Sequence, residues 1–379
     1  MKIIRRILQT EIETRLQPGK VMMLFGARRV GKTVLIKEIE SGFKGKSLFL
    51  NGDDSDATTI IEERSIANYR RLLNGIDLLV IDEAQNIPDI GEKLKLMADH
   101  IQGLHILVSG SSSFDLQNKA GQPLVGRSST FHLLPLSQEE IMSEENALQT
   151  KQDLELRLIY GSYPELYTID SLERKREYLK ELTNAYLLKD ILSFGGIRNA
   201  QKMRDLLSMI AFQVGSEVSL EELGVSLSIS KNTVSSYLDL LSKVFVIYPL
   251  RGYSKNLRKE MSKKNKWFFY DNGIRNALIN DFSLLSTRND AGALWENYLI
   301  SERLKKMYFH LEQKNHFFWR TYDQQEIDLI EEENGQLSAY EFKWGAKTSK
   351  PPLAFTKAYP NAKYSVIDKD NYLSFIINS

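Results

Sequence analysis

The sequence predicts an α/β protein with a parallel sheet, and three apolar runs are the main observation behind this prediction. Residues 21–25, 78–81 and 105–108 are continuously apolar, which is typical of strands buried on both faces of a parallel sheet. A stretch with helical apolar spacing follows the first run. Because ligands bind at the carboxyl ends of such strands, the residues that follow the three runs are the first candidates for a site.

The first run leads into a glycine-rich loop suited to binding phosphates. Residues 26–33 read G-A-R-R-V-G-K-T. The glycines let successive backbone N–H groups point at phosphate oxygens, Lys32 can reach the β- and γ-phosphates, and Thr33 can ligate Mg²⁺. The loop therefore predicts binding of ATP or GTP. The residues expected to contact the nucleotide are Gly26, Ala27, Arg28, Arg29, Val30, Gly31, Lys32, Thr33 and Val34.

The second run ends in a pair of acidic residues that would complete the nucleotide site. Asp82 is placed to hold Mg²⁺, and Glu83 to orient or deprotonate the attacking water. Phosphoryl transfer needs such a positioned nucleophile more than it needs covalent help from the protein. A solvated strand end is the alternative for this pair, and the phosphate loop upstream makes it less favoured.

Two further candidates follow the third run. An additional strand between the phosphate loop and the Asp-Glu strand is usual in hydrolytic enzymes of this kind, and its polar end can sense the γ-phosphate. Ser109 or Ser111 would do this here, with a plain serine-rich turn as the alternative. Arg127 is a candidate arginine finger, acting within the chain or across a subunit boundary, because a guanidinium stabilises charge on the γ-phosphate. A surface arginine is the alternative.

These motifs together resemble a known family. The segments G-A-R-R-V-G-K-T, L-L-V-I-D-E-A-Q, S-G-S-S-S, L-V-G-R-S and G-S-Y-P-E-L are similar to those of bacterial and archaeal AAA-type ATPases that carry a C-terminal domain of uncertain function. The resemblance covers essentially the whole chain. It implies an ATPase core, a winged-helix segment and a restriction-endonuclease-like domain. With a helical lid after the core, the predicted parts are 1–138 (core), 139–200 (lid), 201–275 (winged helix) and 276–379 (nuclease-like domain).

Composition limits the possible functions. The chain has 379 residues, 42% of them hydrophobic, which is enough for two or three domains with real cores. The net charge of +1 creates no global attraction for nucleic acid, so any such binding must depend on local patches. There is no cysteine, hence no disulfide or thiolate metal site, and no stretch reaches the roughly 18 apolar residues of a membrane-spanning helix. We expect a cytoplasmic protein that does not contact a membrane.

The pattern between 202 and 272 predicts a helix-turn-helix followed by a wing. Ser219 begins a capping box, and Ser230 caps a second helix with apolar residues at i, i+3, i+4 and i+7. The second helix would present a polar face outward, formed by Lys231, Asn232, Ser235 and Ser236. Two apolar strands at 244–250 and 267–270 would form the wing. Between them, the segment from Arg251 to Lys266 is strongly basic and could neutralise DNA phosphates, although a solvated hairpin or a protein-docking module is the alternative.

The last hundred residues contain a predicted hairpin. Two alternating strands flank Asn334-Gly335, the strongest signal for a two-residue type I′ turn. With this turn, Asp328 lies directly opposite Glu341, and Glu326 opposite Lys343. Opposed like charges, with Cβ atoms about 4.5–5.5 Å apart, destabilise a hairpin. A divalent cation between them would turn that repulsion into a site.

This arrangement is similar to the PD-(D/E)xK nuclease core. The resemblance implies that Asp328 and Glu341 hold a metal ion, that Lys343 stabilises charge or positions the nucleophile, and that Glu296 adds a helix-borne carboxylate. The proline of the motif is absent. The alternatives are a surface ion pair between Glu326 and Lys343 and a poorly optimised exposed acidic pair.

We therefore expect a Mg²⁺-dependent ATPase that acts on DNA. Because Arg127 has no obvious partner in its own subunit, a homo-oligomer in which the neighbour completes the site is favoured. The alternative from another class is a nucleotide-switched interaction protein, in which the winged helix and a catalytically silent nuclease-like domain bind a protein partner.

Overall fold

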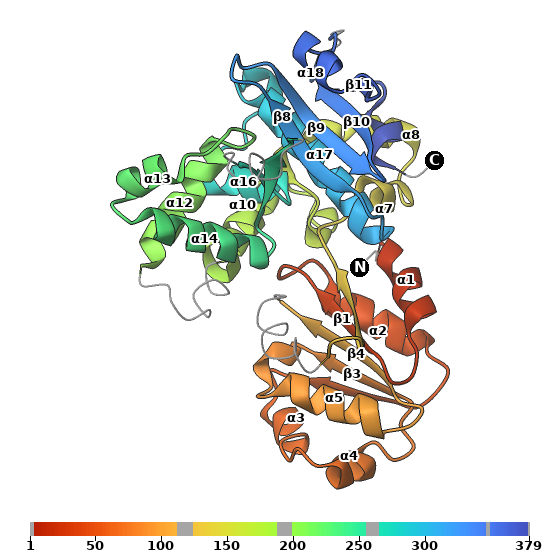
Figure 1. The fold of residues 1–379 in the computed structure, drawn as a ribbon. Helices are drawn as coiled ribbons and strands as arrows, with labels where there is room; N and C mark the ends of the chain where they lie inside the picture. Colours follow the sequence, from red (N-terminus) through yellow and green to blue (C-terminus); the bar gives the residue numbers. More distant parts are fainter. Residues whose placement is uncertain (1–3, 112–123, 188–198, 255–264, 346–348, 378–379) are drawn as a thin grey trace.

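The structure has two sheets, each with its own helices (Figure 1). It is a computed structural model, and it describes residues 4–111, 124–187, 199–254, 265–345 and 349–377. In Figure 1 the amino-terminal third, coloured red to orange, forms one lobe, and the green and blue parts form the other. The chain passes from the first lobe to the second immediately after strand β5 (Ser128–His132).

The first sheet is parallel and has the strand order β2-β3-β4-β1-β5. Its other strands are β1 (Val21–Phe25), β2 (Ser47–Asn51), β3 (Leu78–Asp82) and β4 (His105–Gly110). The three predicted strands are confirmed, and β4 lies between β1 and β3 as expected. Every residue of β1 and β3 is buried, which is why these runs are continuously apolar.

Helices cover this sheet. They are α1 (Ile7–Arg15), α2 (Lys32–Gly42), α3 (Ser55–Ile60), α4 (Ile66–Leu72), the 3₁₀ turn η1 (Ala84–Asn86) and α5 (Ile90–His100). Helix α5 buries Ile90, Leu94 and Met97, a spacing that places all three side chains on one face. The sequence periodicity and the burial therefore agree for this helix.

The segment after the first sheet is helical, as predicted, but it packs as part of the second lobe. Its elements are α7 (Gln138–Met142), α8 (Ala147–Gln152), α9 (Leu154–Tyr160), η2 (Pro164–Tyr167), α10 (Leu172–Glu181) and the π-helical turn η3 (Leu182–Leu187). The backbone N–H of Gln138 donates to Glu302 over 2.7 Å, and Asn276 donates to the carbonyl of Ile159 over 2.8 Å. Buried hydrogen bonds thus tie this segment to the C-terminal part.

The two helices predicted for the helix-turn-helix are both present. After α12 (Ala200–Phe212), α13 (Leu220–Leu227) begins with Ser219 accepting from the N–H of Glu222, and α14 (Lys231–Lys243) begins with Ser230 accepting from the N–H of Thr233. Helix α14 buries four apolar residues of the predicted spacing, Val234, Tyr237, Leu238 and Leu241. Lys231, Asn232, Ser235 and Ser236 are exposed.

The second sheet has six strands in the order β11-β10-β9-β8-β6-β7. They are β6 (Ile247–Gly252), β7 (Lys266–Phe269), β8 (Asn315–Arg320), β9 (Glu326–Glu333), β10 (Gln336–Phe342) and β11 (Lys363–Ile367). Strands β6 and β7, expected to form a wing, pair with each other, and β6 also pairs in parallel with β8. Strands from both sides of the boundary predicted at 275/276 therefore belong to one sheet.

Helices complete the second lobe. They are α16 (Asn272–Leu278), the 3₁₀ turn η4 (Leu285–Thr287), α17 (Ala291–Phe309), α18 (Leu353–Ala358) and α19 (Tyr372–Ile376). Helix α17 is the longest of the described helices and is buried on most sides, with Trp295 completely inaccessible. Figure 1 shows α17 lying against the strands of the second sheet.

The β9–β10 hairpin has the predicted register. Glu333 faces Gln336, and the pairing continues to Leu329 opposite Tyr340. Asn334 and Gly335 have φ values of 51° and 79°, so both turn residues are in the left-handed region that a type I′ turn requires.

Candidate functional site

The loop after β1 has the backbone geometry that the sequence predicts for a phosphate-binding loop. Arg29 and Gly31 have φ values of 63° and 98°, and α2 begins directly afterwards at Lys32. A Cβ atom at Gly26 would lie 2.1 Å from the carbonyl oxygen of Leu133, so only glycine fits there. The amino end of α2, where the helix dipole favours an anion, therefore directly adjoins the loop.

Lys32 lies inside this loop. Its Nζ donates to the carbonyl oxygens of Gly26 and Ala27, each over 3.0 Å, and the residue is only 5% exposed. These contacts hold the ammonium group among the loop carbonyls, at the position from which a lysine reaches phosphate oxygens.

The predicted magnesium ligands meet at the carboxyl edge of the sheet. Thr33 donates its hydroxyl hydrogen bond to Asp82 Oδ2 over 2.6 Å, although 49 positions separate the two residues in the sequence. The other oxygen of Asp82 accepts from the N–H of Glu83 over 3.1 Å and from the hydroxyl of Ser109. A hydroxyl and a carboxylate so close to a phosphate loop are the oxygen ligands that Mg²⁺ takes in nucleotide sites.

Glu83 is held by a residue that the sequence reasoning did not single out. Its backbone has a φ of 48°, and its carboxylate accepts from Gln85 Nε2 over 2.6 Å. Gln85 Nε2 also donates to Ser111 Oγ over 3.3 Å. Of the two serines proposed as phosphate sensors, Ser109 thus contacts Asp82, and Ser111 is linked through Gln85 to Glu83.

A pocket of about 520 Å³ lies over the loop. The P-loop residues from Arg28 to Val34 and Glu83 line one side. Pro164, Glu165 and Thr168 line the pocket from the second lobe. The guanidinium of Arg29 lies 3.4 Å from a Glu165 carboxylate oxygen, so a loop residue contacts the segment that closes the pocket. Nothing in the pattern around Pro164 marks it as part of this site.

A role for Arg127 as an arginine finger within its own chain is wrong. Its carbonyl accepts from the N–H of Val21, which places it at the amino end of β1 and β5, whereas the phosphate loop follows the carboxyl end of β1. Five strand residues separate the two edges, about 16 Å. The Arg127 guanidinium instead pairs with Asp99 over 2.5 Å. A surface arginine, the alternative given above, describes this residue.

The residues of the predicted nuclease-like site lie near one another, but their contacts differ from the prediction. Asp328 accepts from the N–H of Phe342 over 2.7 Å, and Lys343 pairs with Glu341 over 2.6 Å. The alternative of an ion pair between Glu326 and Lys343 is wrong, because Glu326 forms its ion pair with Lys266. Glu296, on α17, also contacts Lys266, over 3.3 Å.

Burial and mutual repulsion affect these carboxyl groups. Burial, Glu296 and Glu341 raise the pKa of Asp328 well above its usual range. Burial also raises the pKa of Glu296, while the ammonium of Lys266 opposes this shift. Within the described part of the chain, no group of three or more His, Asp or Glu side chains is arranged to hold a metal ion. The observed donor set therefore does not fit the divalent cation that the resemblance implies.

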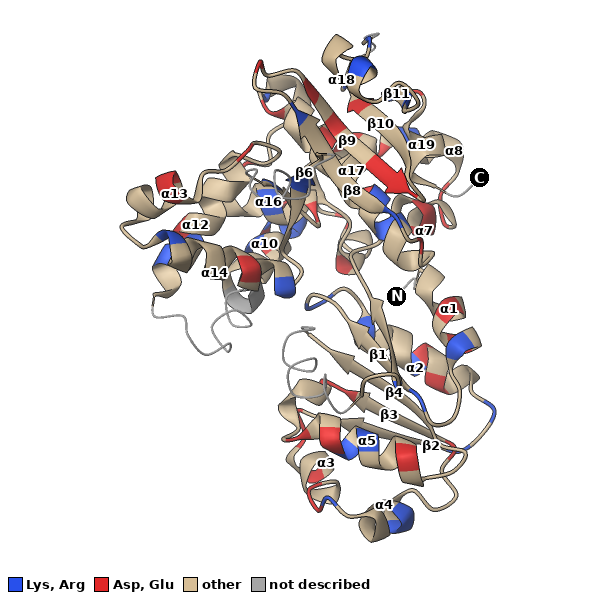
Figure 2. Cartoon of the chain, viewed as in Figure 1, with Lys and Arg blue, Asp and Glu red and all other residues tan. Residues whose placement is uncertain are grey.

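Of the basic residues in the segment proposed to contact DNA, only Arg251 and Lys266 are described by the structure. Lys266 is buried at 3% exposure and is bound to carboxylates, so its assignment as a phosphate contact is wrong. Arg251 is exposed. Residues 255–264, which contain the other basic residues of this segment, lie outside the described residues. In Figure 2, the ribbon positions of basic (blue) and acidic (red) residues are interspersed over both lobes.

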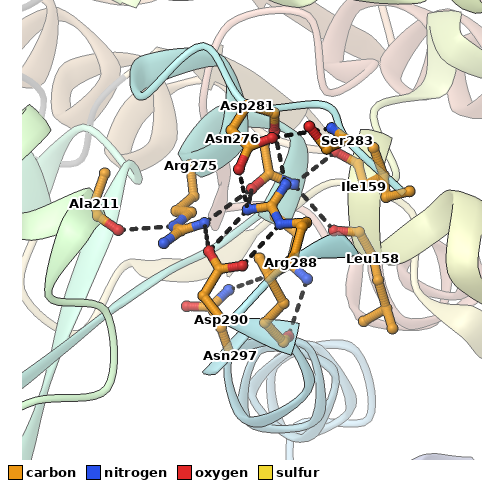
Figure 3. Close-up of polar contacts among 12 residues, drawn as sticks. Leu158, Ile159, Ala211, Arg275, Asn276, Asp281, Ser283, Arg288, Asp290 and Asn297 are labelled. Atoms are coloured by element: carbon orange, nitrogen blue, oxygen red, sulfur yellow. Dashed lines mark hydrogen bonds and ion pairs between the residues drawn. The ribbon is translucent and has the colours of Figure 1, made fainter. Parts of the chain in front are cut away.

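A buried polar network near α16 was not predicted (Figure 3). Arg275 and Arg288 both pair with Asp290, over 2.5 and 2.7 Å, and Arg275 also donates to the carbonyl of Ala211 over 2.7 Å. Burial alone would raise the pKa of Asp290, but the guanidinium groups of Arg288 and Arg275 lower it to about 2. In the sequence these charged residues resemble residues on the exposed face of a helix. No local pattern indicates that they are buried in a polar network.

Comparisons with known families divide the chain into three matched regions. Residues 18–142 match the model of an AAA domain, residues 151–285 match a domain of unknown function (DUF8612), and residues 291–377 match another (DUF4143). The first match and the parallel sheet support an AAA-type P-loop ATPase fold for the amino-terminal third. The second match extends across the predicted lid and winged helix.

Two proteins of similar sequence are described only as uncharacterized proteins. A protein of Mycobacterium tuberculosis is 29% identical over 358 residues, covering 93% of this chain and 76% of its own. A protein of Methanocaldococcus jannaschii is 25% identical over 351 residues, covering 88% and 77%. The similarity thus extends over the three matched regions in both bacteria and archaea.

Solved structures give weaker overlaps. The RuvB Holliday junction branch migration motor of Thermotoga maritima overlaps with a TM-score of 0.31 at 16% identity, covering 68% of this chain and 92% of that one. The Pif1 helicase of Candida albicans overlaps with a TM-score of 0.26 at 14% identity, covering 48% of each chain. At these scores the overlaps support no functional conclusion.

Among the described residues, no helix combines the length and apolar character needed to cross a membrane.

Proposed function

We propose that this protein binds ATP with Mg²⁺ and hydrolyses it. The observation that carries the proposal is the contact of Thr33 with Asp82 over 2.6 Å beside a phosphate-binding loop. Thr33 and Asp82 would hold Mg²⁺, which supplies positive charge to the phosphate oxygens as the anhydride breaks. Lys32 binds the β- and γ-phosphates by exchanging its two carbonyl contacts for phosphate oxygens.

In this proposal Glu83 orients the attacking water and accepts its proton. The left-handed backbone at Glu83 turns the chain sharply at the end of β3, beyond the strand and beside the phosphate loop. Gln85 limits the carboxylate to one orientation through the 2.6 Å hydrogen bond. Positioning of this kind is the main contribution of a protein to phosphoryl transfer.

Hydrolysis would change the contacts between the two lobes. Arg29 of the phosphate loop contacts Glu165 of the second lobe over 3.4 Å, and Pro164 and Thr168 line the same pocket. A triphosphate in the loop would compete for the Arg29 guanidinium and weaken this contact. Loss of the γ-phosphate on hydrolysis would remove this competition, so the nucleotide cycle would act on the segment from Pro164 to Thr168.

The test of hydrolysis is phosphate release from ATP by the full chain, compared with Lys32→Ala. Loss of activity in Lys32→Ala with unchanged thermal stability supports the proposal. The matched control is Lys37→Ala, an exposed lysine on the same helix, which should keep full activity. No phosphate release by the parent with Mg²⁺ and ATP, with or without DNA, would refute it.

We propose DNA as the object of this activity. The exposed polar face of α14, with Lys231 and Asn232, and the exposed Arg251 support it. DNA should stimulate ATP hydrolysis, and binding should weaken steeply with salt because each phosphate contact releases counterions. Reversing Lys255, Arg258 and Lys259 to Glu should remove the binding, while reversing the exposed Lys151 should not. Unchanged DNA binding in the triple variant would exclude the basic segment from the interface.

A second candidate function is a nucleotide-switched interaction protein. The observation that favours it is the ion-paired Lys266 among the carboxylates of the C-terminal part, which leaves that part without the arrangement for metal-dependent cleavage. In this case ATP would set the conformation of the second lobe, and a protein partner would bind there. ATP hydrolysis unaffected by any DNA, together with no salt-sensitive DNA binding, would favour this candidate.

A further inference from the structure

The ammonium group of Lys266 lies inside the acidic cluster of the C-terminal part, which we define as Glu296, Glu326, Asp328 and Glu341. Lys266 begins β7, and its side chain is 3% exposed. The aliphatic stem and ammonium pack near Phe318, with Nζ 5.4 Å from the ring centroid. A lysine so buried must be neutralised by carboxylates nearby, because an isolated charge is costly to remove from water.

The partners of Lys266 come from two different elements. Glu296 on α17 lies 3.3 Å from Nζ, and Glu326 at the start of β9 forms the closer ion pair. Both belong to the region 291–377, whereas Lys266 belongs to the region 151–285. One ammonium group therefore joins two regions that match different family models.

The remaining carboxylates of the acidic cluster also have partners within the chain. Asp328 accepts from the backbone N–H of Phe342, and Glu341 pairs with Lys343 over 2.6 Å. Arg320 lies 3.6 Å from Glu326 and adds a third cation. The four carboxylates of the cluster thus face Lys266, Lys343 and Arg320, the last of which also lies 4.0 Å from Glu217 outside the cluster. A divalent ion would add charge where the repulsion is already partly offset.

We propose that Lys266 is the resident cation of the acidic cluster, that it takes the place of a divalent metal there, and that the cluster joins the two regions rather than cleaving nucleic acid. The contact holds β7 against α17 and β9. The sheet continuity through β6 and β8 keeps Lys266 at the cluster. Charge balance by a lysine on β7, a strand of the same sheet, distinguishes this cluster from a metal-dependent nuclease site.

Binding of Mn²⁺ to the nucleotide-free full chain, followed by electron paramagnetic resonance, tests the proposal. Asp82→Asn is included throughout to remove the carboxylate of the ATP site. We expect no Mn²⁺ site that depends on Asp328 up to about 1 mM, the weak end of protein sites for divalent ions. Lys266→Met removes the ammonium and keeps the aliphatic stem. In this variant one such site should appear, with a Kd at least roughly tenfold below the limit of about 1 mM.

Two matched variants complete the experiment. Lys266→Arg keeps a cation and should gain no site, and Asp328→Asn should abolish the site gained by Lys266→Met. A Mn²⁺ site in the Lys266-containing protein that Asp328→Asn removes would overturn the proposal. So would a folded Lys266→Met protein that gains no site. If Lys266→Met does not fold, the comparison with and without Asp328→Asn in the Lys266-containing protein still decides, since absence of the site supports the proposal and its presence refutes it.

Discussion

Arg6 and Glu140 form a buried ion pair over 2.9 Å, and 134 positions separate them in the sequence. The same guanidinium donates to the carbonyl of Val30 in the phosphate loop and to that of Leu134, each over 2.7 Å. One side chain near the amino terminus therefore holds the phosphate loop, the end of the first sheet and the start of α7. No pattern in the first residues of the sequence indicates this role.

Arg6→Met should destabilise the protein by about 3–5 kcal/mol, because it leaves the Glu140 carboxylate buried without its partner. The free energy of unfolding from urea titration measures the loss. Arg5→Met is the matched control: Arg5 is exposed, and we expect a change below about 0.5 kcal/mol. Equal effects of the two substitutions would show that the buried pair has no special importance.

Glu83→Gln should lower kcat for ATP hydrolysis by about 100-fold or more, the usual contribution of a general base, and leave ATP affinity nearly unchanged. Steady-state kinetics with a separate measurement of nucleotide binding distinguish the two effects. Glu62→Gln, an exposed change on the same lobe, should alter neither. A change in KM alone would show that Glu83 contributes to binding rather than to the chemical step.

Arg127→Ala should leave the ATPase rate of the dilute protein unchanged within about twofold, since the loss of a true arginine finger would cost about 1,000-fold or more. The measurement is a rate series over protein concentration, with Asp99→Asn as the control that breaks the same ion pair from its other side. A large loss for Arg127→Ala, but not Asp99→Asn, that occurs only in concentrated samples would indicate a finger acting across a subunit boundary. A large loss at every dilution would contradict the position assigned to Arg127.

His132 predicts a specific dependence of stability on pH. Burial lowers the pKa of His132 from 6.5 to about 4, so the folded state favours the neutral ring. The unfolded chain takes up the proton first as the pH falls, and the stability present above pH 6.5 is therefore lost toward pH 4. Between about pH 7.5 and 5 this contribution amounts to about 2 kcal/mol.

His132→Phe should remove that contribution and flatten the pH profile of unfolding, since the ring already packs among Phe25, Phe245 and Tyr308. His310 acts in the opposite direction, because its hydrogen bond with Glu139 raises its pKa, and its contribution is lost as the pH rises. The difference between the parent and His132→Phe cancels the effect of His310. The exposed His100→Gln is the control, and an equal slope in all three proteins would contradict the prediction.

Gly335→Ala should destabilise the protein by about 1 kcal/mol, because the type I′ turn holds this residue at a φ of 79°. Gly292→Ala is the matched control. Gly292 lies in α17 with open space at the position of a Cβ, so alanine should be neutral or stabilising there by up to about 1 kcal/mol. Thermal unfolding of both variants measures the contrast, and a stabilising Gly335→Ala would exclude the turn type.

Local signals predicted much of the fold because they act over short distances. Asn334-Gly335 alone determines the turn, and the alternation of the flanking residues then sets the hairpin register. The three apolar runs are strands in the predicted arrangement, and the serine caps of α13 and α14 are at the predicted residues. In the nucleotide site, the contact of Thr33 with Asp82 follows from the rule that parallel strands end at one edge.

Long-range contacts account for what the sequence did not reveal. Lys266 belongs to a basic run, and only the pairing of β6 with β8 brings it among carboxylates from α17 and β9. Arg127 follows a glycine like a loop residue, and only the parallel pairing of β5 with β1 places it at the wrong edge for its proposed role. Gln85 has no feature that separates it from other polar residues after a strand.

The pairing of β6 with β8 has a practical consequence for work with fragments of the chain. A polypeptide cut at the 275/276 position would expose the hydrogen-bonding groups of β8, and the complementary piece would lose the strand that covers β6. The unpaired N–H and C=O groups of such edges form hydrogen bonds with strands of other molecules, which promotes aggregation. A recombinant fragment of the C-terminal part should therefore begin upstream of Ile247, so that it contains all six strands of the second sheet.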